Sequence, residues 1–156
     1  MRALELKIPP PVVALLIAAG MWLLSSAFQP SSLSLGVRIA WGVGLAAMGQ
    51  AISVSGMVAF RRARTTINPL NPGAATFLVQ AGIYRYTRNP MYVGLLLSLA
   101  GWAAYLGQVL PVVGLPFFVW YITQFQIKPE ERILAAMFGA EFTEFTEYLS
   151  KVRRWA

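Results

Sequence analysis

Four long apolar stretches, separated by short polar breaks, constrain the fold of this chain more than any other feature of its sequence. They cover residues 11–28, 36–60, 90–106 and 110–127. Each approaches or exceeds the roughly 20 residues that a helix needs to cross the apolar layer of a bilayer. The chain is 57% hydrophobic and only 12% charged, whereas soluble domains are about 25% charged. The sequence therefore predicts an all-α integral membrane protein with four transmembrane helices.

Composition excludes several kinds of site. The chain has 156 residues, enough for one domain, and we expect a single membrane domain over residues 1–156. It has no cysteine, no histidine and no aspartate, which excludes disulfides, ordinary zinc sites and Ser-His-Asp triads, and we expect no metal site. The formal net charge is +7. Because the cations flank apolar stretches instead of forming one basic face, they favour membrane orientation over nucleic-acid binding.

The distribution of charge also predicts the orientation in the membrane. With four spans, the N-terminus, the 61–89 loop and the C-terminal segment share one side, which holds all of the thirteen Lys and Arg residues except Arg38. The positive-inside rule makes that side cytoplasmic. We therefore expect a multi-pass protein of the cell membrane with both termini in the cytoplasm. A cleaved signal peptide is the alternative for residues 11–28, because Ser25-Ser26-Ala27 follows an apolar core.

Small residues and prolines predict local features of the helices. Gly49, Ser53 and Gly56 lie on one face of the second stretch, which allows a neighbouring helix to approach closely; a slot for a flat ligand is the alternative. Pro116 predicts a kink in the fourth stretch. Pro129 and the two glutamates after it predict the start of an amphipathic C-terminal helix over about 129–150.

The segment from Gly82 to Gly94 brings polar side chains to the start of the third stretch. It reads Gly-Ile-Tyr-Arg-Tyr-Thr-Arg-Asn-Pro-Met-Tyr-Val-Gly. Asn89 can accept hydrogen bonds from the free N–H groups of a helix and Pro90 fits the first helical position, so the pair predicts a helix start. A loop rich in arginine and tyrosine would therefore lie at the cytoplasmic end of this span.

Each of these polar groups has an ordinary structural explanation. Arginines 61, 62 and 64 follow the second stretch and mark topology. The pair Glu130-Glu131 offsets the dipole of the last helix, and Asn-Pro is a cap. Their joint placement on one side of the membrane nevertheless indicates a site.

Two motifs together resemble those of the isoprenylcysteine carboxyl methyltransferase family, which is related to the membrane phospholipid N-methyltransferases. Residues 82–94 resemble its G-x-Y-x-x-x-R-[HN]-P-x-Y-x-G signature. Glu130-Glu131 followed by Phe138-Gly139 resembles its second motif. The resemblance covers about residues 65–154, with an apolar hairpin between the two motifs.

The resemblance implies methyl transfer from S-adenosyl-L-methionine to a lipophilic acceptor, with S-adenosyl-L-homocysteine as the product. It implies catalytic roles for Arg88 and Glu131. The cofactor-binding residues that it implies are Gln80, Gly82, Ile83, Tyr84, Arg88, Asn89, Pro90, Tyr92, Gly94, Glu130 and Glu131.

The side chains of this set suit such a cofactor. Arginine can bind the cofactor's carboxylate with two parallel hydrogen bonds, and a glutamate can accept from the ribose hydroxyls or face the ammonium group. Tyrosine can contact the sulfonium through its ring face. Gly94 would let a ligand approach the backbone.

The acceptor is less constrained than the cofactor. The chain lacks histidine, so a carboxylate acceptor, which needs no base, is favoured over an amine, which must first lose a proton. The alternatives are a phospholipid amine N-methyltransferase, a membrane reductase that uses a nicotinamide cofactor, and a non-catalytic membrane scaffold.

This chain also departs from the family pattern. Asn89 stands where many relatives have histidine, and Phe142 and Phe145 stand where tyrosines are frequent. Arg154-Trp155-Ala156 replaces a terminal proline motif. These departures bear on the acceptor more than on the cofactor.

Overall fold

The computed structural model describes residues 5–29, 33–62 and 82–140, together with Thr143, Glu147 and Trp155. Every regular element in these residues is helical, which confirms the all-α prediction. The α-helices are α1 (Pro10–Ser26), α2 (Leu35–Arg62), α3 (Pro90–Leu106), α4 (Gly114–Ile122) and α5 (Lys128–Phe138). Two 3₁₀ helices, η3 (Gly82–Arg85) and η4 (Leu110–Val113), precede α3 and α4, and the π-helix η5 (Thr123–Ile127) joins α4 to α5.

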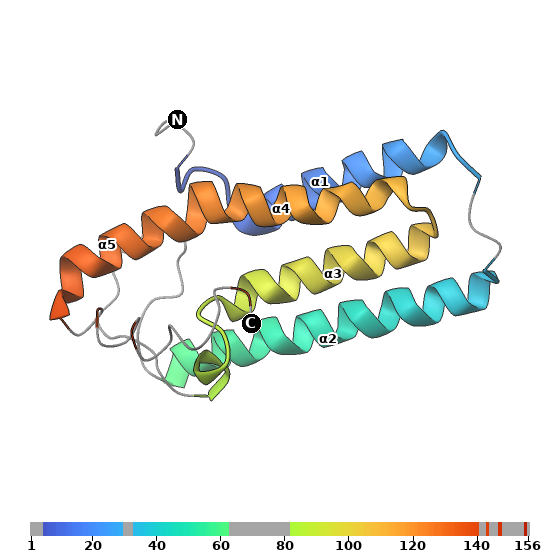
Figure 1. Ribbon diagram of the computed structural model, residues 1–156. Helices are drawn as coiled ribbons and strands as arrows, with labels where there is room; N and C mark the ends of the chain where they lie inside the picture. The colour runs from blue at the N-terminus through green and yellow to red at the C-terminus, as the bar shows by residue number, and fades with distance from the viewer. Residues whose placement is uncertain are drawn as a thin grey trace.

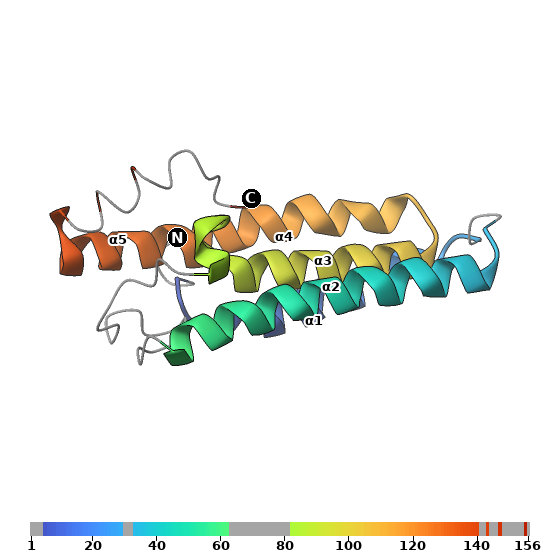
Figure 2. The same ribbon diagram turned by 90° about the horizontal axis from the view of Figure 1, so that it is seen from below.

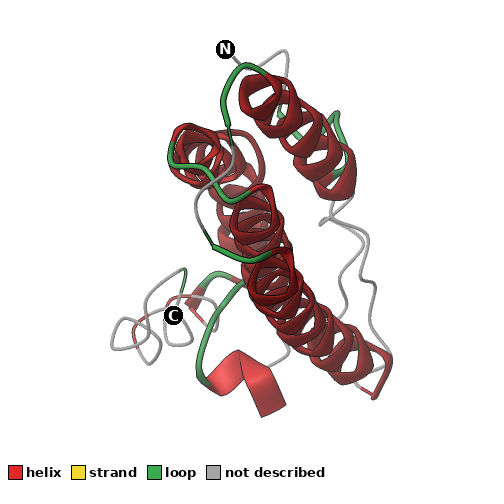
Figure 3. Ribbon diagram, turned by 90° about the vertical axis from the view of Figure 1, so that its right-hand side faces the viewer, coloured by secondary structure: helices red, strands yellow, loops and turns green. Residues whose placement is uncertain are grey.

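Helices α1, α2, α3 and α4 run side by side in alternating directions (Figures 1 and 2). The middle helix is α3, which packs against α2 on one side and against α1 and α4 on the other. Seen along their axes, the helices form a stack (Figure 3). Helix α5 continues the line of α4 beyond the bundle. The start of α1, the end of α2, η3 and α5 all lie at one end of the molecule, which we call the polar end.

Within the described residues, two helices are long and apolar enough to cross a membrane, Leu35–Ala59 and Leu110–Met137. In the second of these, the apolar stretch ends at Ile127, before the charged residues of α5. Helices α1 and α3 are apolar but shorter, with 17 residues each. Large apolar side chains on the outside of α1 and α2 are well exposed, including Leu15 at 70% and Trp41 at 63%. Contiguous apolar surface of this kind fits a lipid environment better than water.

Two sequence predictions about helix geometry differ in part from the structure. Pro116 does not interrupt α4, because it lies in the first turn, where a missing N–H removes no bond within that helix. The predicted helix over 129–150 is interrupted after Phe138, because Gly139 adopts a φ of 51°. Ala140, Thr143 and Glu147 are again helical, and the other residues of 141–150 lie outside the described residues. Positive φ is accessible to glycine and breaks the helical path.

Small residues allow α2 and α3 to pack with their backbones nearly in contact. A Cβ atom on Gly101 would lie 2.6 Å from the carbonyl oxygen of Gly42, and one on Gly94 would collide with Ser53 and with the Gly49 backbone. The close approach predicted from the small-residue face is confirmed. Since α3 fills that face, it is not a ligand slot.

Helix α1 is attached to the bundle by side chains that donate to its backbone carbonyls. Trp102 Nε1 donates to Ala18 O at 3.0 Å. At the C-terminal end of α1, which is far from the polar end, Gln108 Nε2 donates to Ser25 O at 3.1 Å and to Phe28 O at 2.6 Å. These bonds hold α1 against α3 and the α3–α4 connection.

Arg38, the one cation that the sequence places on the far side, caps the C-terminus of α3. Its Nε donates to Tyr105 O and its Nη2 to Leu106 O, each at 2.8 Å. The guanidinium also lies 5.7 Å from the centre of the Tyr105 ring. A cation at this position offsets the negative end of the helix dipole and satisfies carbonyls that lack helical partners.

The close contact of α2 and α3 makes a stability prediction. Gly101→Ala is expected to lower the free energy of unfolding by about 1–3 kcal/mol, because the new methyl group would press on the Gly42 backbone. Gly44→Ala is the matched control, since no atom lies within 4 Å of its added Cβ. Thermal unfolding in detergent compares the two variants, and equal melting temperatures would contradict the packing role of Gly101.

Candidate functional site

The start of α3 is set by the Asn89-Pro90 pair, as the sequence predicts. Asn89 occupies the N-cap position, Pro90 is the first helical residue, and the N–H groups of Tyr92 and Val93 donate to Asn89 O, each at 3.0 Å. The side chain of Asn89 makes no capping hydrogen bond, so that part of the prediction was wrong. Its backbone N–H instead donates to Thr87 Oγ1 at 3.2 Å. This bond directs the chain into the helix.

The turn before α3 directs Arg88 toward α5. Gly82 begins η3 with a φ of 66°, and the N–H of Tyr86 donates to Ile83 O at 3.0 Å. Tyr84 is buried, whereas Arg85 is exposed. The two arginines of this segment are therefore separated by the turn: Arg85 lies at the surface, and Arg88 points toward the last helix.

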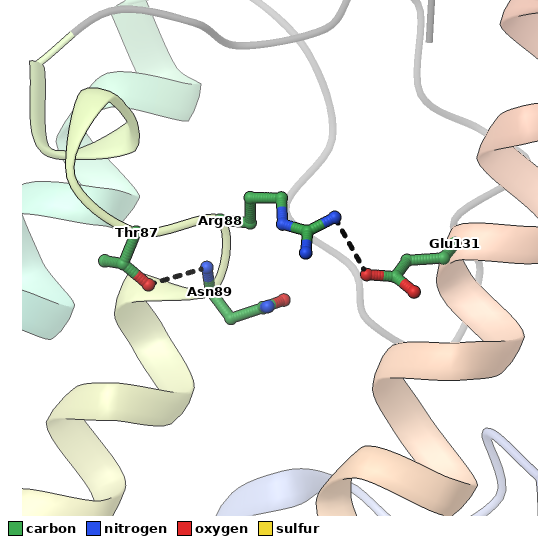
Figure 4. A network of polar contacts seen from close by, with 4 residues as sticks. All are labelled: Thr87, Arg88, Asn89 and Glu131. Atoms are coloured by element: carbon green, nitrogen blue, oxygen red, sulfur yellow. Dashed lines mark hydrogen bonds and ion pairs between the residues drawn. The ribbon is translucent and has the colours of Figure 1, made fainter. Parts of the chain in front are cut away.

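Arg88 and Glu131 form an ion pair that joins the start of α3 to the start of α5. Arg88 Nη1 lies 3.3 Å from Glu131 Oε1, and the two side chains are 19% and 21% exposed. Figure 4 shows the side chains pointing toward each other. Their partial shielding from water makes this pair stronger than an exposed surface pair.

Glu130 has a different kind of partner. The hydroxyl of Tyr92 donates to Glu130 Oε1 at 2.7 Å. The ion pairs within the described part of the chain are Arg88–Glu131 and Arg132–Glu5. Among these residues, Glu130 is therefore balanced by a neutral hydroxyl and not by a cation.

This arrangement shifts the protonation of two groups that lie outside the apolar stretches. The pKa of Glu130 is raised from 4.5 to about 7, mainly by burial; the Tyr92 hydrogen bond lowers it in part, and the nearby charge of Glu131 adds a smaller increase to this net value. Burial, followed by the charge of Glu130, raises the pKa of Tyr84 well above its ordinary value. The site thus has a neutral phenol and a carboxyl group that titrates near neutrality. No cluster of three or more His, Cys, Asp or Glu side chains within the described ranges could hold a metal ion.

The structure gathers some of the predicted site residues and separates others. The contacts described above join Arg88, Tyr92, Glu130 and Glu131, and the charge of Glu130 reaches Tyr84. Gly94 instead faces Gly49 and Ser53 of α2, where its lack of a side chain serves helix packing. The other predicted positions divide as follows: Pro90 is buried, Ile83 and Asn89 are partly buried, Gly82 is exposed, and Gln80 lies outside the described residues, as does Arg64.

Sequence reasoning missed two polar residues near the site. Thr87 is 3% exposed and accepts the Asn89 N–H; a threonine just before a helix cap is a recognisable signal. Gln126 is fully buried one turn before Glu130, and its Nε2 donates to Ile8 O at 2.8 Å. A glutamine at the end of an apolar stretch is easily taken for a surface residue, and no local pattern indicates its partner.

Comparison with known proteins identifies the family. The phospholipid methyltransferase family matches residues 37–141, about two thirds of the chain. The chain belongs to this family. It is also 45% identical over 65 residues to a protein of Haemophilus influenzae described as uncharacterized, an alignment that covers 42% of this chain and 98% of that protein. No solved structure is significantly similar. The match confirms the resemblance drawn from residues 82–94 and Glu130-Glu131, and it makes the chain a member of a membrane methyltransferase family.

The raised pKa of Glu130 predicts a pH dependence of stability. The folded state binds a proton more readily than the unfolded state, so the group stabilises the fold below pH 4.5, and this stability is lost as pH rises through about 7. In protein without bound ligand, the loss is expected to reach up to about 3 kcal/mol. Glu130→Gln should remove this part of the slope. Melting temperatures measured in detergent across this range test it, and an unchanged slope in the variant would contradict the shift.

Proposed function

We propose that the protein is an S-adenosyl-L-methionine-dependent methyltransferase that acts on a lipophilic acceptor at the cytoplasmic face of the membrane. The observation that carries the proposal is the pairing at the polar end: one carboxylate is matched by Arg88, and a second, Glu130, is matched by a hydroxyl. A buried carboxylate without a cation is a good partner for a positively charged ligand. Membership of a methyltransferase family supports the same chemistry.

The residues that meet at the polar end fit the functional groups of this cofactor. Arg88 can bind a carboxylate, whereas Glu130 and Glu131 can bind an ammonium group, hydroxyls or a sulfonium. Tyr84 and Tyr92 offer aromatic faces to a cation. When bound, S-adenosyl-L-methionine supplies a methyl group on a positively charged sulfur. The protein's part is to align the acceptor and to exclude water.

An amine is the acceptor that the geometry supports best. The sequence favoured a carboxyl group because the chain has no histidine, and an amine would need desolvation or a carboxylate to remove its proton. Glu130, with a pKa of about 7, is such a base, since it can hold a proton taken from an ammonium group near neutral pH. The family description, phospholipid methyltransferase, agrees with an amine-bearing lipid. A carboxyl acceptor is the second candidate.

The membrane arrangement is part of the proposal. We place α1, α2, α3 and the helix that contains α4 across the bilayer, with the polar end in the cytoplasm. Their alternating directions (Figure 1) and the apolar outer surfaces of α1 and α2 support four spans. Arg61, Arg62 and Arg85 are exposed at the polar end, as the positive-inside rule requires of the cytoplasmic side.

Replacement of Arg88 tests the cofactor site. Wild-type protein in detergent is expected to bind S-adenosyl-L-homocysteine in titration calorimetry. Arg88→Ala should weaken binding about tenfold or more, because a charge-assisted hydrogen bond is lost. Arg85→Ala, an exposed arginine three residues away, is the matched control and should bind as wild type. Equal affinities of the two variants would remove Arg88 from the site, and no binding by wild type would overturn the proposed cofactor.

Product chemistry distinguishes the acceptor classes. Lipid extract is incubated with the protein and with cofactor that carries a labelled methyl group. We expect labelled lipid whose methyl group survives mild alkali, because a methylamine is stable and a methyl ester is hydrolysed. Loss of the label in alkali would favour the carboxyl acceptor. Glu130→Gln should suppress methylation of an amine, and full activity of this variant would remove Glu130 as the base.

A further inference from the structure

The junction between α4 and α5 lacks one backbone hydrogen bond of a regular helix. Pro129 has no N–H, so it cannot donate to the carbonyl oxygen of Phe125 four residues earlier. The turn before it, η5, is a π-helix, a form that accommodates such interruptions. By geometry this junction is a point at which α5, with Glu130 and Glu131, could change direction relative to α4.

The segment before α1 binds at this junction. The N–H of Leu6 donates to Phe125 O at 3.0 Å, which supplies the donor that Pro129 lacks. Leu6 adopts a φ of 55°, an uncommon value for a residue other than glycine, to make this contact. Two residues later, Ile8 O accepts from Gln126 Nε2 at 2.8 Å. The segment is thus bonded to two successive residues of the π turn.

A third contact reaches α5 itself. Arg132 Nη2 lies 2.6 Å from Glu5 Oε2, with side chains 56% and 25% exposed. A surface pair of this kind contributes little, whereas the amide of Gln126 is fully buried. The Oε1 atom of Gln126 has no partner among the described residues, which is unfavourable, so an apolar residue of equal size would avoid a penalty. The hydrogen bond from Gln126 Nε2 to Ile8 O offsets the cost of leaving Oε1 without a partner.

We propose that Gln126 is a positioning residue: through Ile8 and the bound segment 5–8, it fixes the direction of α5 and so holds Glu130 and Glu131 against Tyr92 and Arg88. The distance from Gln126 to Glu130 is one helical turn, so a small change at η5 moves both carboxylates. A test by affinity for S-adenosyl-L-homocysteine rests on the proposed function, whereas a test by the measured distance between the turn after η3 and α5 does not.

Gln108 provides a matched control. It is a second glutamine whose Nε2 donates to backbone carbonyls of residues 25 and 28 and whose Oε1 is buried without a partner in the described ranges. It lies in the α3–α4 connection, beside the C-terminal end of α1. Figure 1 shows this connection at the end of the bundle away from α5. Gln108→Met therefore removes the same chemistry from the attachment of α1 without touching the α4–α5 junction.

Spin labels measure the position of α5 directly. The chain has no cysteine, so cysteines at the exposed positions Tyr86 and Met137 give one specific label in the turn after η3 and one on α5. In Gln126→Met the distribution of label distances is expected to broaden and shift, and in Gln108→Met to match wild type. Affinity for S-adenosyl-L-homocysteine should fall about tenfold in the first variant only, as expected if α5 is correctly placed about a tenth of the time.

The outcomes separate positioning from general stability. An unchanged distance distribution in Gln126→Met overturns the inference, as do equal losses of affinity in both glutamine variants. Where Gln126→Met does not fold, Gln126→Asn, whose shorter side chain keeps the amide but draws it back from Ile8 O, decides by the same measurement: a broadened distribution supports positioning, and an unchanged one overturns it. If wild type does not bind S-adenosyl-L-homocysteine, the proposed function fails and the label distances alone test Gln126.

Discussion

The near contact of the α2 and α3 backbones is the constraint on which the rest of the structure depends. Glycines at both surfaces let the helices approach until the carbonyl of Gly42 lies where a side chain of Gly101 would be. This packing fixes α3 at the centre of the bundle, with α1 and α4 on its other side. Because Tyr92 lies in the first turn of α3, and Arg88 just before it, the position of α3 decides where half of the candidate site lies.

The other half of the site depends on α5, and electrostatics connects the two. Two adjacent glutamates at a helix start repel each other, yet each has a partner of different charge: a guanidinium for Glu131 and a hydroxyl for Glu130. The unequal partners give two neighbouring carboxyl groups different environments. Glu131 is paired with a cation, whereas the pKa of Glu130 is raised to about 7. Sites that bind charged ligands or move protons commonly contain groups separated in this way.

Residues that start and end helices predicted much of the fold from the sequence. Asn89-Pro90 marked the start of α3, and Gly107, with a φ of 69°, ends it as a left-handed cap. The end of α5 at Phe138 was missed because the periodic pattern of apolar residues continues beyond Gly139, and periodicity does not reveal a backbone break.

The sequence predicted which residues belong to the candidate site, but not which of them contact one another. Gly94 shows why: a glycine that admits a ligand and a glycine that admits another helix look the same in a sequence, and only the position of Ser53 distinguishes them. The π turn at Thr123–Ile127 was likewise beyond sequence reasoning, because its missing donor comes from Leu6, far away in the chain.

The attachment of α1 has a consequence for how this protein can diverge. In the described part of the chain, the side-chain hydrogen bonds that the rest of the protein makes to residues 8–28 all end on main-chain carbonyls, at Ile8, Ala18, Ser25 and Phe28. Any amino acid presents that oxygen, so the first helix can exchange most of its outward side chains without losing these anchors. The family match begins at residue 37, after α1. An interchangeable first helix would let the same methyltransferase framework adapt its lipid-facing edge to different bilayers while the polar end stays intact.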